Sequence, residues 1–228
     1  MTRPRSIALF GGSFDPVHVG HMAVARAAQR RFHLDEVHFI PAGRPPHKTR
    51  HEMTAFLHRY AMVALACADH AHFIPSLAEA GADLSGRHVH YSIDTLRGFR
   101  HALRSHDRLF FIVGADQFLE IPTWRSYETL LDSCDFIAVS RPGFRMDALR
   151  LVIPPELFAS ASRGFGTRSA KHDAHSIVLR RSTVHLLDTV RSHVSATEVR
   201  RRRRHGQSIH GLVPPRVEEY ILRQALYL

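Results

Sequence analysis

Residues 7–21 read IALFGGSFDPVHVGH, and this stretch decides the predicted fold. Ile7–Phe10 is a short, wholly apolar run, which is typical of a strand buried on both faces of a parallel sheet. The run ends in Gly11-Gly12, and a helical pattern begins at about Gly20 and ends near Phe32. A buried strand, a glycine-containing loop and a helix in this order predict the first half of a βαβ unit.

The rest of the chain repeats this alternation of strands and helices. The expected strands are Val37–Ile40, Phe73–Leu77, Leu109–Val113, Phe136–Val139 and Val184–Leu187, and the expected further helices are Thr54–Ala68, Ile93–Leu103 and Pro215–Tyr227. Phe144–Ser176 has little periodicity and predicts variable surface structure. The pattern predicts an α/β fold: a Rossmann-like, doubly wound, mostly parallel sheet with helices on both faces. We expect a single domain over residues 1–228, with a small C-terminal helical portion at about 195–228.

The composition excludes several classes of protein. Hydrophobic residues make up 44% of the 228 positions, which is ordinary for a globular chain. No apolar run approaches the roughly 18 residues of a membrane span, and the run after Arg5 is too short for a signal peptide. Cys67 and Cys134 lie in apolar stretches without metal-ligand spacing. These features predict a cytoplasmic protein with free, buried thiols and no membrane association.

The charge balance points to anionic ligands. Lys and Arg number 31 against 21 Asp and Glu, which gives a net charge of +10. Such a surface attracts nucleic acid, an anionic membrane or a small phosphorylated substrate. Part of the excess comes from the unbroken run Arg200–Arg204. We expect this run to be a solvated helix face, with Arg200 as a separate case.

The loop after the first strand has the features of a phosphate site. It matches neither G-x-G-x-x-G nor the P-loop, but its two glycines allow close backbone approach, and the following helix offers free N–H groups. His18 and His21 are three positions apart at this helix N-terminus, so both imidazoles can face one phosphate. With 19 histidines in the chain, a chance structural pair is one alternative. A metal site is another, but no third ligand with suitable spacing is evident, and no metal-binding residues are predicted.

The loop resembles the signature G-G-[TS]-F-D-P-x-H-x-G-H of the HxGH nucleotidyltransferase superfamily, and specifically of bacterial nicotinate-mononucleotide adenylyltransferases. Further segments resemble the same family in the same order: Pro45-Pro46-His47-Lys48, Tyr91–Leu96, Gly114-Ala115-Asp116 with Trp124, Arg141-Pro142-Gly143 and Val194–Arg200. Only residues at about 144–182 lack counterparts. Several ordered matches over nearly the whole chain are more specific than any single motif.

The resemblance implies that the chain transfers the adenylyl group of ATP to nicotinate mononucleotide. The products would be pyrophosphate and nicotinate adenine dinucleotide, an intermediate of NAD biosynthesis. It implies catalytic roles for His18, His21 and Arg200. It implies ATP-binding roles for Phe10, Gly11, Gly12, Ser13, Gly114, Asp116, Ser195 and Thr197. It implies roles in binding the acceptor for His47, Lys48, Ser92, Trp124, Arg125 and Arg141.

Some of these roles are specific. Trp124 would stack on the pyridine ring, and Ser92 would donate to the nicotinate carboxylate, helped by backbone N–H near residue 125. Arg125 departs from the family, which usually has an aromatic residue there, and we expect its side chain to point to solvent. Mg²⁺ would arrive with the triphosphate and need no dedicated protein ligand.

Other interpretations remain open. The acceptor could be nicotinamide mononucleotide or another phosphorylated compound such as 4′-phosphopantetheine, although enzymes for the latter are usually shorter and lack the Trp124 region. From a different class, the chain could be a basic nucleic-acid-binding protein on the same fold. The interleaved aromatic and basic residues of RRM or OB domains are absent, so nucleic acid is not an expected partner. Assembly into a homo-oligomer is left open.

Overall fold

The computed structural model describes residues 3–43, 53–81, 84, 89–140, 144–159, 175–188 and 193–228. The chain divides into two compact units. The first unit comprises Ile7–His90 and Arg191–Leu228, and the second comprises Met1–Ser6 and Tyr91–Val190. The single domain over residues 1–228 therefore stays a prediction, and each unit is described by itself.

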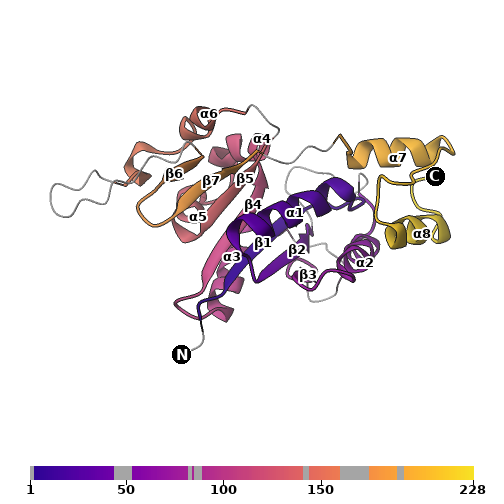
Figure 1. Cartoon of the computed structure of the whole chain (residues 1–228), viewed down its shortest axis with the longest axis horizontal. Helices are drawn as coiled ribbons and strands as arrows, with labels where there is room; N and C mark the ends of the chain where they lie inside the picture. The colour runs from indigo at the N-terminus through magenta and orange to yellow at the C-terminus, as the bar shows by residue number, and fades with distance from the viewer. Residues whose placement is uncertain are drawn as a thin grey trace. The chain divides into compact units, whose positions relative to one another are not determined.

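The first unit holds three parallel strands in the order β3-β2-β1. They are β1 (Ser6–Gly12), β2 (Glu36–Pro41) and β3 (Phe73–Pro75). Leu9 of β1 lies opposite His38 of β2, and Val37 lies opposite Phe73. The helices of this unit are α1 (Val19–Phe32), α2 (Phe56–Cys67), α7 (Ala196–Arg204) and α8 (Pro215–Arg223), which Figure 1 draws in indigo, purple and yellow.

The second unit holds strands in the order β4-β5-β7-β6. They are β4 (Arg108–Gly114), β5 (Asp135–Val139), β6 (Ser176–Val178) and β7 (Thr183–Leu187). The pairs β4–β5 and β5–β7 are parallel, whereas β6 pairs with β7 in the antiparallel sense. Its helices are α3 (Ser92–Ala102), α4 (Ala115–Leu119), η2 (Ile121–Thr123), α5 (Tyr127–Ser133), α6 (Met146–Arg150) and η3 (Pro155–Leu157).

The predicted fold class is confirmed, because in each unit the described strands are mostly parallel and alternate with helices. The apolar runs of the sequence are the buried strands: Ala8 and Leu9 of β1 and Phe136–Ala138 of β5 are all 0% exposed. No helix in the described parts of the chain is long and apolar enough to cross a bilayer. Both cysteines are free and buried as predicted, and burial raises the pKa of the Cys67 thiol to about 12.

Three expectations about the elements need correction. The segment Phe144–Ser176 is predicted to be variable surface structure with little periodicity, but its described residues contain the short elements α6 and η3, and β6 starts at Ser176. The short helices α4 and α5 were not predicted, because five to seven residues give too little periodicity. The C-terminal helix ends at Arg223 and not at Tyr227. The chain turns there, with left-handed backbone at Ala225 (φ 49°) and at Tyr227 (φ 64°).

Candidate active site

The loop between β1 and α1 is held by a cluster of aromatic rings. Phe14 adopts left-handed backbone (φ 45°), and its side chain is 1% exposed. Its ring centroid lies 5.5 Å from that of Phe10, 5.6 Å from that of Phe39 and 4.9 Å from that of His21. Burial of this ring offsets the cost of its backbone conformation. The buried ring of Phe14 therefore holds the loop on the core side of the backbone of Gly11, Gly12 and Ser13.

His18 and His21 stack at the start of α1. Their ring centroids are 3.7 Å apart, with 29° between the ring planes. His18 is the N-cap residue, and its backbone N–H donates to Nδ1 of His21 over 3.2 Å. An accepting Nδ1 places the proton of the neutral His21 ring on Nε2. Nδ1 of His18 is buried and has no hydrogen-bond partner within the described residues.

Both imidazoles are neutral near pH 7. Burial lowers the pKa of His18 to about 4. The pKa of His21 is lowered well below its usual value, first by burial and then by His18. A neutral imidazole can still donate from one nitrogen and accept at the other. Because a buried polar atom without a partner costs about 1–3 kcal/mol, the unpartnered Nδ1 of His18 is typical of a functional site.

The N-terminus of α1 offers fewer free N–H groups than we expected. Val19 donates its backbone N–H to Leu212 O over 3.0 Å, and His21 and Met22 both donate to the carbonyl of His18. Among the described residues, the N–H of Gly20 is the one left in this first turn without an acceptor. The loop before α8 thus covers part of the helix end, and an anion would find one backbone donor beside the two histidines.

Arg200 joins α7 to the loop that carries the histidines. Its Nη1 donates to the backbone oxygen of Asp15 over 2.6 Å, and its Nη2 reaches Thr197 Oγ1 at 3.5 Å. Ser195 is the N-cap of α7, and its Oγ accepts from the N–H of Glu198 over 3.2 Å. Ser195 and Thr197 are exposed, so their hydroxyls can still donate to a ligand. The structure therefore brings Arg200 to the loop, with Thr197 beside its guanidinium, as a joint phosphate site requires.

The remaining arginines of α7 are only partly the solvated face that we expected. Arg201 and Arg204 are exposed, whereas Arg202 and Arg203 are half-buried. Arg201 and Arg202 both donate to the carboxylate of Glu198, at 2.9 and 2.8 Å. These two hydrogen bonds lower the pKa of Glu198 to about 2.

Arg59 is a residue of this site that the sequence analysis missed. Its side chain is buried, at 2% exposed, and donates to three backbone carbonyls: Thr54 O at 2.9 Å, Ser13 O at 2.9 Å and Gly43 O at 3.4 Å. It therefore connects the loop after β1 to Gly43 and Thr54. A signal was present in the sequence, because Arg59 falls on the apolar face of α2 with Phe56 and Val63.

Gly43 must remain a glycine, since a Cβ there would lie 2.4 Å from the carbonyl oxygen of Glu79.

Asp15 and Tyr227 are two further residues of the site that the sequence analysis did not predict. The hydroxyl of Tyr227 donates to Oδ1 of Asp15 over 2.7 Å, and Asp15 is 3% exposed.

The second unit holds the residues predicted for adenosine and for the pyridine ring. Gly114 ends β4, and a Cβ on it would lie 2.6 Å from Oδ1 of Asp116, so glycine leaves room for that carboxylate. Asp116 itself is exposed in the first turn of α4. Ser92 is the first residue of α3.

Trp124 is half-buried and meets Phe111 edge-on, with 6.3 Å between ring centroids. Arg125 is exposed, as expected, and its guanidinium lies 4.6 Å from the centroid of the Tyr91 ring. This cation–π contact brings Arg125 to the residue that precedes Ser92.

Some predicted residues cannot be placed. His47, Lys48 and Arg141 lie outside the described residues. No group of three or more His, Cys, Asp or Glu side chains that could hold a metal ion occurs in the described ranges.

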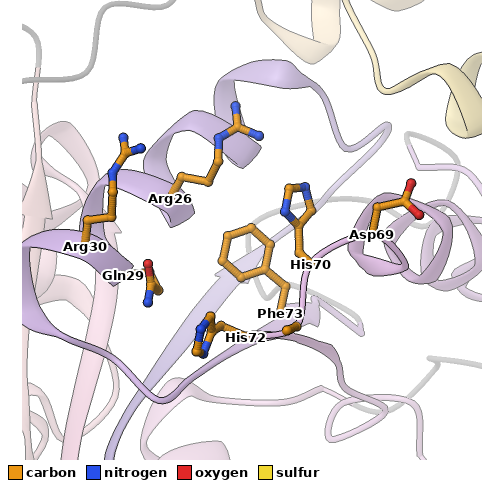
Figure 2. A pocket seen from close by; sticks show the side chains of 8 residues that line it. Arg26, Gln29, Arg30, Asp69, His70, His72 and Phe73 are labelled. Atoms are coloured by element: carbon orange, nitrogen blue, oxygen red, sulfur yellow. The ribbon is translucent and has the colours of Figure 1, made fainter.

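A cavity of about 250 Å³ in the first unit is formed elsewhere, by side chains of α1 and of the segment leading into β3 (Figure 2). Its lining includes Arg26, Arg30, His70 and Phe73 but none of the predicted site residues.

Comparison with known proteins identifies the family. The model of the cytidylyltransferase-like family matches residues 9–202. A protein of Moorella thermoacetica named "Probable nicotinate-nucleotide adenylyltransferase" is 37% identical, over 100% of this chain and 94% of its own length. A protein of the same name from Geotalea uraniireducens is 38% identical, over 97% of each chain. The chain belongs to the nicotinate-nucleotide adenylyltransferase family. The nucleotidyltransferase membership predicted from the sequence is thus confirmed.

The fold of this nicotinate-nucleotide adenylyltransferase family member also has solved counterparts. The structure of Plasmodium falciparum nicotinic acid mononucleotide adenylyltransferase complexed with NaAD superposes with a TM-score of 0.71. The match covers 98% of this chain and 97% of that chain at 18% sequence identity, so it shows the shared fold.

Proposed function

We propose that the protein transfers the adenylyl group of ATP to nicotinate mononucleotide. The observation that carries the proposal is the convergence of His18, His21 and Arg200 on the loop after β1, where the buried Nδ1 of His18 has no partner among the described residues. Neutral N–H donors beside a fixed guanidinium suit an α-phosphoryl group on which negative charge develops. The family membership supports the same chemistry.

In the proposed reaction, a phosphate oxygen of the mononucleotide attacks the α-phosphorus of ATP. The bond from this phosphorus to the bridging oxygen breaks, and pyrophosphate leaves with the electron pair. Nicotinate adenine dinucleotide forms without a covalent enzyme intermediate. The side chains therefore contribute by orientation and by stabilising charge.

His21 would donate from Nε2, since its Nδ1 already accepts from the backbone of His18. Arg200 would present the edge of its guanidinium that Asp15 and Thr197 leave open. Gly11–Ser13 would lie along the triphosphate, with Phe10 beneath. Ser195 and Thr197 would donate their hydroxyls from the N-terminus of α7. Mg²⁺, bound through the triphosphate, would supply charge neutralisation, in line with the chemistry of this enzyme class.

The acceptor subsite is proposed for the second unit and for residues outside the described ranges. Trp124 would stack on the pyridine ring and Ser92 would donate to the carboxylate, whereas Gly114 and Asp116 of the same unit would hold the adenosine of ATP. Arg125, bound over the ring of Tyr91, would add positive charge near Ser92. His47, Lys48 and Arg141 would contact the mononucleotide. We place this reaction in the cytoplasm, where ATP and the mononucleotide are available.

One experiment tests the function. The purified protein is incubated with ATP, MgCl₂ and one acceptor: nicotinate mononucleotide, nicotinamide mononucleotide or 4′-phosphopantetheine. Pyrophosphate release and the mass of the product identify the reaction. We expect nicotinate adenine dinucleotide, with kcat/KM for the acid at least about tenfold above that for the amide. The amide presents a donor where Ser92 and backbone N–H also donate, which leaves a buried group unpaired at about 1–3 kcal/mol.

Two variants locate the acceptor subsite. Trp124→Ala should raise the KM of nicotinate mononucleotide and leave the KM of ATP nearly unchanged, whereas Trp124→Phe should retain most of the affinity through its ring. Ser92→Ala should narrow the acid-over-amide ratio more than it lowers turnover. Equal kcat/KM for acid and amide in the unmodified protein would exclude the carboxylate subsite, and no dinucleotide with any acceptor would exclude adenylyl transfer.

A further inference from the structure

We propose that Tyr227 is a positioning residue for the reaction: it acts through Asp15 on the loop that carries His18 and on Arg200. The inference rests on the proposed function, because that loop and Arg200 are the parts expected to hold the triphosphate. Tyr227 itself is not expected to touch either substrate. Its contribution is to keep Asp15, and with it the phosphate-handling groups, in one place.

Asp15 is the point at which three separate parts of the first unit meet. Its Oδ1 accepts from Tyr227 over 2.7 Å, and its Oδ2 accepts from the backbone N–H of Thr54 over 3.1 Å. Its backbone oxygen accepts from Nη1 of Arg200 over 2.6 Å. At 3% exposed, Asp15 has little water to replace any of these donors. The carboxylate is thus held by the C-terminal turn, while the carbonyl of the same residue holds the guanidinium.

The chain reaches Asp15 by a defined turn after α8. The N–H of Ala225 donates to Leu222 O over 3.2 Å, and that of Leu226 donates to Ile221 O over 3.1 Å. This pattern, with left-handed backbone at Ala225 (φ 49°), reverses the chain at the end of the helix. The Tyr227 hydroxyl then lies between Asp15 and the sulfur of Met62, which is 4.0 Å away. Burial and the Asp15 carboxylate raise the pKa of Tyr227, so its hydroxyl stays protonated and donates.

Loss of the Tyr227 hydroxyl would affect the loop and not only the C-terminal turn. Oδ1 of Asp15 would then be a buried carboxylate oxygen without its donor, which is a costly state. A shift of the loop toward water would hydrate this carboxylate oxygen. Because Arg200 donates to the backbone carbonyl of the same residue, the shift would also move Arg200. His18 follows Asp15 by only three positions. A displacement of a few tenths of an ångström there would move both the imidazole pair and the guanidinium away from their geometry.

The chain offers a matched control for the critical substitution. Tyr220, on α8, also uses its hydroxyl to connect α8 with α2, at 2.9 Å from Nδ1 of His58. That contact does not involve Asp15. Tyr227→Phe and Tyr220→Phe each remove one hydroxyl from a half-buried tyrosine of the C-terminal region. The first hydroxyl contacts Asp15 in the loop, and the second contacts His58 on α2. Only Tyr227→Phe therefore acts on Asp15.

The test compares the two variants in full-length protein. We measure kcat, KM for each substrate and the thermal midpoint, and we titrate a non-hydrolysable ATP analogue calorimetrically. Tyr227→Phe should lower kcat/KM for ATP about tenfold and weaken binding of the analogue, with KM for nicotinate mononucleotide within twofold of wild type. Tyr220→Phe should keep kcat/KM for ATP within twofold, at a comparable loss of thermal midpoint. In an Asp15→Asn background, Tyr227→Phe should have almost no further effect on kcat/KM, because both changes interrupt one path.

The outcomes separate the two proposals. If Tyr227→Phe behaves like Tyr220→Phe in kcat/KM and in analogue affinity, the C-terminal turn is only structural and the inference is wrong. The inference is also wrong if the losses of kcat/KM for ATP caused by Tyr227→Phe and by Asp15→Asn are fully additive in the double variant. If the unmodified protein forms no dinucleotide, the proposed function fails, while the analogue titration still decides whether Tyr227 organises an ATP site.

Discussion

At the scale of single residues, His18 has conflicting structural and catalytic requirements. It is the N-cap of α1, a position where Asn, Asp, Ser or Thr would normally satisfy the N–H groups of the first turn. Instead, a buried imidazole stands there, and its Nδ1 has no partner in the part of the chain that the structure describes. A better cap was available to the chain, and a residue that gives up such stabilisation is typical of a functional site.

His18→Asn is therefore expected to separate stability from activity. Asn caps α1 and removes the buried imidazole, so the free energy of unfolding should rise by up to about 1 kcal/mol. The kcat of adenylyl transfer should fall by about 10²–10³, as for loss of one donor to a developing oxyanion. Thermal unfolding and steady-state kinetics measure both. His33→Asn, at the exposed, left-handed C-cap of the same helix, is the matched control and should keep wild-type kcat. A normal kcat in His18→Asn would disprove the phosphate role of His18.

At the scale of elements, the arginines of α7 differ in their surroundings: Arg200 contacts the loop, Arg201 and Arg204 are exposed, and Arg202 and Arg203 are half-buried. Arg200 reaches the loop after β1, whereas Arg201 pairs with Glu198 on the same helix. An exposed pair of this kind contributes little to stability because solvent screens it, and Arg202 still pairs with Glu198 if Arg201 is lost. The loss of activity on replacing an arginine of α7 should therefore depend on its position on the helix and not on the number of arginines that remain.

Arg200→Ala should lower kcat/KM for ATP by at least about 10², because it removes a fixed positive charge and releases the carbonyl of Asp15. Arg201→Ala should stay within about twofold of wild type. Kinetics at two salt concentrations make the comparison, since the effect of Arg201 should also vanish at high salt. Similar losses in both variants would mean that the run acts as a single basic patch, and binding of RNA without ATP turnover would then favour the nucleic-acid alternative.

At the scale of the whole molecule, His18 and His21 couple stability to pH. The pKa of His18 is about 4 in the fold against 6.5 as its ordinary value, and that of His21 is lowered as well. Between pH 4 and 6.5 the unfolded chain therefore binds more protons at these positions than the folded one. Stability should be unaffected by these groups above about pH 6.5 and should fall as the pH decreases below it.

Denaturant titrations at pH 7 and pH 5 check this dependence. His18 alone should account for a loss of about 2 kcal/mol over this interval, from 1.36 kcal/mol per pKa unit over the 1.5 units below 6.5. His18→Asn should show a correspondingly smaller loss, although His21 continues to titrate. An equal loss in the wild type and in His18→Asn would show that His18 is not buried as a neutral ring.

Local sequence was sufficient to predict the strands and helices around which the molecule is built. Ile7–Phe10, Leu109–Val113 and Phe136–Val139 are apolar runs, and a run of this kind is buried on both faces in almost any α/β fold. The histidine loop was equally readable, because its chemistry lies within a few consecutive residues. The three-residue strand β6 could not be predicted from local sequence, since only its pairing with β7 makes it a strand.

Only the tertiary structure decided how the site in the first unit is held. Asp15 is 212 positions from Tyr227 and 185 from Arg200, yet it hydrogen-bonds with both. Arg59 donates to backbone carbonyls of three segments, and the carbonyl of Leu212 accepts from the backbone N–H of Val19 at the start of α1. Hydrophobic periodicity reports which face of an element is buried, but it carries no information on which distant element covers that face. A buried donor is satisfied by whichever acceptor the packing brings within about 3 Å, and that pairing exists only once the chain has folded.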